Sequence, residues 1–159
     1  MKQILLIVFI ASLYLVSCSK AENNREEALL LNNYAMSLSM RDKMDSAVIV
    51  QKLAIEKDSL DFHLWANYST LLVKQRDFVQ ALYAMKSALR VKPDFAEAAS
   101  WIGMYYDHVS DTLNSKLYLD SALSLHNKRV TIRDSCDTRG NRAFALLWTG
   151  NISQARIDI

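Results

Sequence analysis

The chain has 159 residues, enough for one domain of ordinary size, and a formal net charge of +2. Hydrophobic residues make up 51% of it and charged residues 23%, which is typical of a folded protein and argues against disorder. Three glycines and one proline are too few for a turn-rich β-sandwich or a glycine-rich phosphate loop, so the composition favours an all-helical protein. The small net charge gives no support to nucleic-acid binding.

The first eighteen residues combine a positive residue, a short apolar run and a cysteine. Lys2 precedes thirteen almost entirely apolar residues, Ile4 to Val16. A helix that spans a bilayer needs about twenty such residues, so the run fits the apolar core of a secretory signal peptide better. A small residue, Ser17, then stands directly before Cys18.

The stretch Leu15-Val16-Ser17-Cys18 resembles the lipobox of bacterial lipoproteins. The resemblance implies cleavage of a signal peptide over residues 1–17, a diacylglyceryl thioether on Cys18 and acylation of its new amino group. Several acyl chains anchor a protein stably where a single chain would be marginal. The alternative is an ordinary cleaved signal in which Cys18 has no role.

The polar residues 18–27 are expected to form a lipidated tether. No acidic run follows Cys18, which favours a lipid-anchored location in the bacterial cell envelope, at the outer membrane and facing the periplasm. If Cys18 carries lipid, Cys136 has no disulfide partner, and we expect it to be a small core residue.

The sequence holds no pattern typical of catalysis or metal binding. No HExxH motif, paired CxxC motif or nucleophile with a partnered base occurs. Asp107 and His108 are adjacent, so on a helix they point about 100° apart and do not form an acid–base pair. The histidines are too few and too scattered for a zinc site: His63, His108 and His126. We therefore expect no enzyme activity, no metal and no cofactor.

A helix–turn–helix pattern repeats along the rest of the chain. Between Leu64 and Pro93, two stretches carry apolar residues at three- and four-residue spacing, separated by Gln75-Arg76-Asp77. Pro93 ends the second stretch, because proline cannot continue a helix. Small residues that lie 34 positions apart mark equivalent places in three units: Ala47, Ala81 and Ser115, and likewise Ala54, Ala88 and Ala122. After an insertion of about six residues near 127–135, Ala143 and Ala155 indicate a fourth, partial unit.

This pattern resembles the tetratricopeptide repeat (TPR), whose period is 34 residues. The resemblance covers residues 28–159 and implies an all-α, right-handed superhelix of about three and a half repeats, at about 28–61, 62–95, 96–129 and 136–159. One helix pair cannot bury its own apolar face, but stacked pairs share a continuous core. Two residues depart from the pattern: Gln51 stands where a large apolar residue is usual, and Gly140 weakens the start of the fourth unit.

The resemblance also implies that the first helix of each pair lines a concave groove that holds a peptide or a helix. The residues expected in this groove are Asn32, Met36, Met40, His63, Thr70, Lys74, Met104, Asp107, His108 and Trp148, with Ala66, Ser100, Phe144 and Leu147 beside them. Methionine is flexible, so such a lining tolerates partners of varied shape. For Met36 and Met104, packing between units as core residues is an equal alternative.

These features predict a lipid-anchored TPR protein of the bacterial envelope that acts as a protein–protein interaction scaffold. Its partner is an unidentified protein or peptide, and it meets the membrane through lipid on Cys18. The alternative is an N-terminal docking or sensory region of a larger envelope enzyme or transporter, truncated at residue 159. A third, weaker reading is a carbohydrate-uptake lipoprotein with embedded TPR helices.

Overall fold

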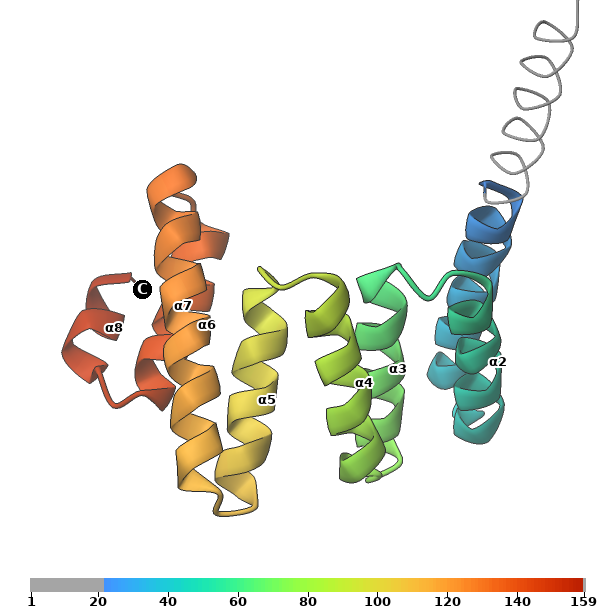
Figure 1. Cartoon of the computed structure of the whole chain (residues 1–159), viewed down its shortest axis with the longest axis horizontal. Coiled ribbons are helices and arrows are strands. Elements are labelled where there is room, and N and C mark those ends of the chain that lie inside the picture. The colour runs from blue at the N-terminus through green and yellow to red at the C-terminus, as the bar shows by residue number, and fades with distance from the viewer. Residues whose placement is uncertain (1–21, 159) are drawn as a thin grey trace, which may run out of the picture.

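The computed structural model describes residues 22–158, which form a row of helices (Figure 1). The leader, Cys18 and residue 159 lie outside the described residues. The first helix covers residues 22–40, and the others are α2 (Met44–Lys57), α3 (Phe62–Lys74), α4 (Phe78–Val91), α5 (Ala96–His108), α6 (Thr112–Ile132), α7 (Cys136–Trp148) and α8 (Ile152–Asp158). The predicted all-α class is confirmed. Of the described helices, none combines the length and the apolar composition that crossing a membrane requires.

The helices form pairs that stack in chain order, from residues 22–40 with α2 at one end to α7 with α8 at the other (Figure 1). A three-residue turn joins the two helices of each pair, and its central residue has a left-handed backbone. The φ angles are +59°, +63°, +61° and +80° at Asp42, Arg76, Ser110 and Gly150. The first three are 34 residues apart, so the sequence period is also a backbone period.

Side-chain caps fix where most of the later helices begin. The carboxylate of Asp77 accepts the backbone N–H of Gln80 at 3.1 Å at the start of α4. Equivalent caps open α3 at Asp61 and α6 at Asp111. At α7 the side chain of Ser135 and that of Thr138 bond each other's backbone N–H, which is a capping box. Each cap satisfies an N–H group that has no partner inside the helix.

Small buried residues let the two helices of a pair approach each other. In the first helices, Ala35, Ser69, Gly103 and Ala143 occupy one repeat position, and all are buried. In the second helices, the buried counterparts are Ala47, Ala81, Ser115 and Ala155. The hydroxyl of Ser69 donates to the carbonyl of Ala81 at 2.9 Å, which ties α3 to α4. A side chain larger than these would push the helices apart.

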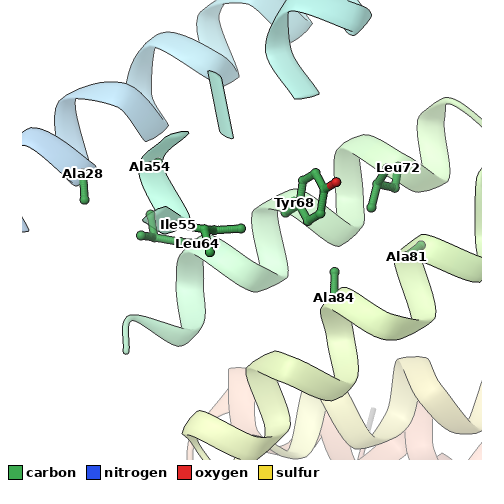
Figure 2. Close-up of a cluster of buried hydrophobic side chains, with 8 residues drawn as sticks. All are labelled: Ala28, Ala54, Ile55, Leu64, Tyr68, Leu72, Ala81 and Ala84. Carbon is green, nitrogen blue, oxygen red and sulfur yellow. The ribbon is translucent and has the colours of Figure 1, made fainter. Parts of the chain in front are cut away.

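The apolar core is continuous from one pair to the next. One cluster draws its residues from helix 22–40 and from α2, α3 and α4: Ala28, Ala54, Ile55, Leu64, Tyr68, Leu72, Ala81 and Ala84 (Figure 2). Two successive helix pairs therefore bury their apolar faces against each other, as a repeat stack requires.

One segment differs from the expectation drawn from the sequence, and the structure shows where a second, the insertion, is accommodated. Residues 22–27, which we expected in the tether, are the first turns of helix 22–40. An ion pair of 2.9 Å between Glu27 and Lys57 and the burial of Ala28 hold this end against α2. The insertion near 127–135 lengthens α6, which has 21 residues. Arg129 in this extension pairs with Glu97 on α5.

The expectation that Cys136 is a core residue was wrong. Cys136 is exposed at the first position of α7. The buried face of this helix begins only at Ala143, so a side chain in the first turn lies outside the interface with α6.

His126 is a buried histidine between α5 and α6. Its side chain is 2% exposed, and its Nε2 lies 3.4 Å from Oγ of Ser100. Burial lowers the pKa of His126, the carboxylate of Glu97 opposes this, and the positive charge of Arg129 lowers it further. The folded chain therefore binds a proton at His126 more weakly than the unfolded chain does.

We predict that the fold loses stability on mild acidification because of His126. The contribution of the neutral His126 to stability is fully present above pH ~6.5, the ordinary histidine pKa. It is lost as the pH falls through the lower pKa that His126 has in the folded chain. Chemical unfolding at pH 7 and pH 5 measures the loss, which is at most about 1.4 kcal/mol per pH unit. His126→Gln should reduce this loss. An unchanged pH dependence in His126→Gln would contradict the prediction.

We predict that Gly103→Ala destabilises the fold, because a Cβ at this position would lie 2.7 Å from Cγ of Leu119 on α6. The expected loss in the free energy of unfolding is about 1–3 kcal/mol. Gly140→Ala is the matched control, since its Cβ meets no atom within 4 Å. It should stabilise α7 by about 0.5–1 kcal/mol. Urea unfolding of both variants tests this, and equal effects of the two changes would disprove the close approach.

Candidate partner-binding groove

A half-open pocket of about 280 Å³ lies between α3, α4 and α5. Its lining includes Thr70, Val73, Phe78, Leu82, Met85, Trp101, Met104, Tyr105 and His108. We call it the α3–α5 pocket. The lining is mostly apolar with a few polar groups, which is the usual make-up of a site that binds a side chain or a small molecule.

Helical spacing positions the pocket residues. Thr70 and Val73 lie one turn apart on α3, and Met104 and His108 lie one turn apart on α5, so each pair shares one helix face. Phe78 is the first residue of α4, directly after its Asp77 cap. The ring centroids of Phe78 and His108 are 5.9 Å apart, so these residues form one wall of the pocket from two helices.

Trp101 gives the pocket an exposed aromatic rim. Its side chain is 54% exposed although it lines the pocket, and Val73 and Phe78 are 42% and 39% exposed. Large apolar side chains that surround a hollow yet remain in contact with water are typical of binding sites.

A polar cluster lies on the N-terminal side of the pocket, where helix 22–40, α2 and α3 meet. Oδ1 of Asn32 accepts a hydrogen bond from Nε2 of Gln51 at 3.1 Å and another from Nδ2 of Asn67 at 2.8 Å. Nε2 of Gln51 also donates to the carbonyl of Leu64 at 2.9 Å. Gln51 is fully buried at a position where other units have an apolar residue. Its side-chain amide therefore supplies hydrogen bonds where those units have apolar contacts.

Lys74 extends this polar side, because its Nζ donates to Oγ of Ser39 at 3.0 Å across the helix pairs. Met40 is 82% exposed at the end of helix 22–40. Met36 instead packs against a core cluster of Ala35, Leu38, Ala47 and Leu71, which is the alternative position that the sequence left open.

The remaining predicted groove residues lie in different places. Thr70, Met104 and His108 meet at the α3–α5 pocket. His63 is at the start of α3, with its Nδ1 3.0 Å from Oδ1 of the Asp61 cap, and it lines a separate hollow with Lys57. Asp107 is exposed at the end of α5. Ser100, expected beside the groove, is buried against His126.

Trp148 belongs to an aromatic surface on α7. Its ring centroid lies 6.3 Å from that of Phe144, and Leu147 beside them is 47% exposed. Arg142 on the same helix bonds Asp158 of α8 through Nε at 2.6 Å. This bond holds the pKa of the Asp158 carboxyl below its ordinary value and joins the last two helices.

Four pocket residues were not predicted from the sequence: Val73, Phe78, Trp101 and Tyr105. A signal for Trp101 was present, because it stands three residues before Met104 and so shares its helix face. Among residues 22–158, no group of three histidine, cysteine or acidic side chains is placed to hold a metal ion.

No family model matches the chain, and no curated protein sequence matches it. Solved structures do match. The first TPR domain of Spaghetti (RPAP3), bound to the HSP90 peptide SRMEEVD, has a TM-score of 0.63 at 17% identity and aligns over 83% of this chain and 94% of its own. The TPR2B domain of yeast Sti1, in a complex with pHsp70, has a TM-score of 0.56 at 18% identity over 80% and 96%. MamA has a TM-score of 0.53 at 14% identity over 83% and 74%.

These identities are too low to carry a function across, but the shared architecture spans most of each chain. The predicted fold class is confirmed, and the chain has the tetratricopeptide-repeat fold, an all-α solenoid of stacked helix pairs.

Proposed function

We propose that this protein is a lipid-anchored scaffold of the bacterial envelope that binds a partner peptide along its groove. The observation that carries the proposal is the α3–α5 pocket, an apolar hollow with the exposed Trp101 at its rim. The polar cluster around Asn32 lies next to it along the row of helices. A peptide needs both kinds of surface, because it presents apolar side chains and a polar main chain.

Two neighbours in fold support this proposal. The Spaghetti domain is bound to an HSP90 peptide, and the Sti1 domain is in a complex with pHsp70. These domains resemble this chain in fold only, so the nature of its partner has to be inferred from the residues of this chain. The pocket residues favour a large apolar side chain, and burying one contributes about 1.5–3 kcal/mol to binding.

The anchor is the second part of the proposal, and it rests on the lipobox resemblance around Cys18. Acyl chains on this cysteine would hold the module at a membrane of the envelope. Confinement to a surface raises the effective concentration of the groove for partners at the same surface. The chain would then act by equilibrium binding, not by catalysis.

We predict that Trp101→Ala weakens peptide binding in the groove. Peptides selected from a random display library against the wild-type protein should lose at least about tenfold in affinity, because the rim loses its largest apolar surface. Tyr83→Ala is the matched control: Tyr83 is also 54% exposed but lies on α4 and does not line the pocket. Isothermal titration of both variants gives the comparison. Equal affinities for wild type and Trp101→Ala would rule out the pocket as the binding site.

We predict that lipid attaches at Cys18 and not at Cys136. Cells that express the protein and are fed radioactive palmitate should label the wild-type chain and the Cys136→Ser variant. The Cys18→Ser variant should remain unlabelled and should leave the membrane fraction. Labelling of Cys18→Ser would show that the leader is not a lipoprotein signal.

A further inference from the structure

Four exposed apolar side chains occupy the same repeat position on four second helices. Ile49 on α2, Tyr83 on α4, Leu117 on α6 and Ile157 on α8 are 61%, 54%, 63% and 71% exposed. Each stands two residues after one of the buried small residues that face the first helix of its pair. Two steps along a helix rotate a side chain by about 200°, so these four lie on the side of their helices opposite the small contact residues. We call them the outer stripe. The ring of Tyr83 also reaches the edge of α3, where its centroid lies 6.2 Å from that of Trp65.

Further apolar side chains widen the outer stripe. Val79 and Leu113 lie one turn before Tyr83 and Leu117 and are 70% and 80% exposed, while Leu53 lies one turn after Ile49. Single exposed apolar residues are ordinary on protein surfaces. Their recurrence at one position of four successive helices produces an apolar surface that runs along the outside of the stack.

Basic side chains flank the outer stripe on every one of these helices. Each stripe residue has a lysine or an arginine within three positions in the sequence: Lys52, Lys86, Lys116 and Arg156. Of these, Lys86 turns toward α5, where its Nζ donates to the hydroxyl of Tyr106 at 2.6 Å. The guanidinium of Arg90 lies 6.0 Å from the ring centroid of Tyr83. The acids nearby are Asp45, Asp120 and Asp158, and two of them are engaged elsewhere: Asp45 with Gln75 at 2.7 Å and Asp158 with Arg142. Asp120 is exposed on α6, three residues after Leu117. The outer side of the second helices is therefore apolar with a basic border.

We propose that the outer stripe rests on the surface of an anionic lipid bilayer. Its apolar side chains would enter the interface, and the flanking lysines and arginines would meet the lipid phosphates. A bilayer receives side chains without a preformed hollow, which fits this surface: neither of the two hollows described above is lined by a stripe residue. The outer side would then face the membrane, and the α3–α5 pocket would remain open to partners.

This inference does not depend on peptide binding in the groove. It extends the proposed anchor, because a lipid on Cys18 would hold the stripe near a bilayer but would not determine which side of the stack touches it. The stripe and its basic border determine that orientation.

A spin label reports directly which face meets the lipid. The full chain carries Cys18→Ser and Cys136→Ser, and single labels are placed at Leu117→Cys or, as the control, at the exposed Asp107→Cys on α5. On vesicles of phosphatidylcholine and phosphatidylglycerol, the label at 117 should become accessible to oxygen and shielded from a water-soluble nickel complex. The label at 107 should stay in water. A label at 117 that stays in water in the presence of these vesicles would overturn the proposal. This holds whether the chain binds the vesicles by another segment, does not bind them, or uses the stripe to bind an acidic protein.

Vesicle partition of a stripe variant gives a second measurement. Replacing Ile49, Tyr83, Leu117 and Ile157 together by serine should weaken partition into the anionic vesicles at least about tenfold. Vesicles of phosphatidylcholine alone should bind the unchanged chain more weakly, and added salt should weaken binding to the anionic ones. The exposed positions make unfolding of the variant unexpected, and circular dichroism checks its helix content. Equal partition of the stripe variant and the unchanged chain would overturn the proposal.

Discussion

The whole structure depends on how closely the two helices of each pair approach each other. Alanine, serine or glycine occupies the contact position in every pair, and each of these residues is buried. At Gly103 the space is so tight that even a Cβ would meet the side chain of Leu119. Because small residues make the contact within a pair, the larger apolar residues pack against the neighbouring pair. The cluster in Figure 2 is such a shared core. The stack is therefore stabilised by contacts within each pair and between neighbouring pairs, not by one central core.

This arrangement separates the roles of the two sets of helices. The first helices present different chemistry along the stack: amide groups at Asn32 and Asn67, then the apolar α3–α5 pocket, then the aromatic pair on α7. The second helices carry the repeated outer stripe and its basic residues. Because all of these side chains stand on helices fixed by the shared core, a partner would meet surfaces that are already formed, which lowers the entropic cost of binding.

The fold followed from the sequence because its determinants are periodic. Small residues at 34-residue spacing predicted the helix pairs, and the structure buries them. The site was harder to predict, because it depends on which helix faces meet. Trp101 shares a face with Met104, yet only the structure brings it opposite Phe78. Single contacts with no periodic signal were missed as well, such as Ser100 with His126 and Arg142 with Asp158. Cys136 was misplaced because a residue in the first turn of a helix need not share its buried face.

The indole N–H signals of the three tryptophans offer the most direct measurement of binding in the groove. Trp65, near the start of α3, donates to the carbonyl of Ser59 at 2.9 Å. Trp101 lines the α3–α5 pocket, and Trp148 lies on α7. A selected peptide should be titrated into the ¹⁵N-labelled protein while nuclear magnetic resonance follows these three signals. The account predicts that the Trp101 signal shifts in a saturable manner while the Trp65 signal stays in place. Saturable binding that leaves Trp101 unmoved would contradict it.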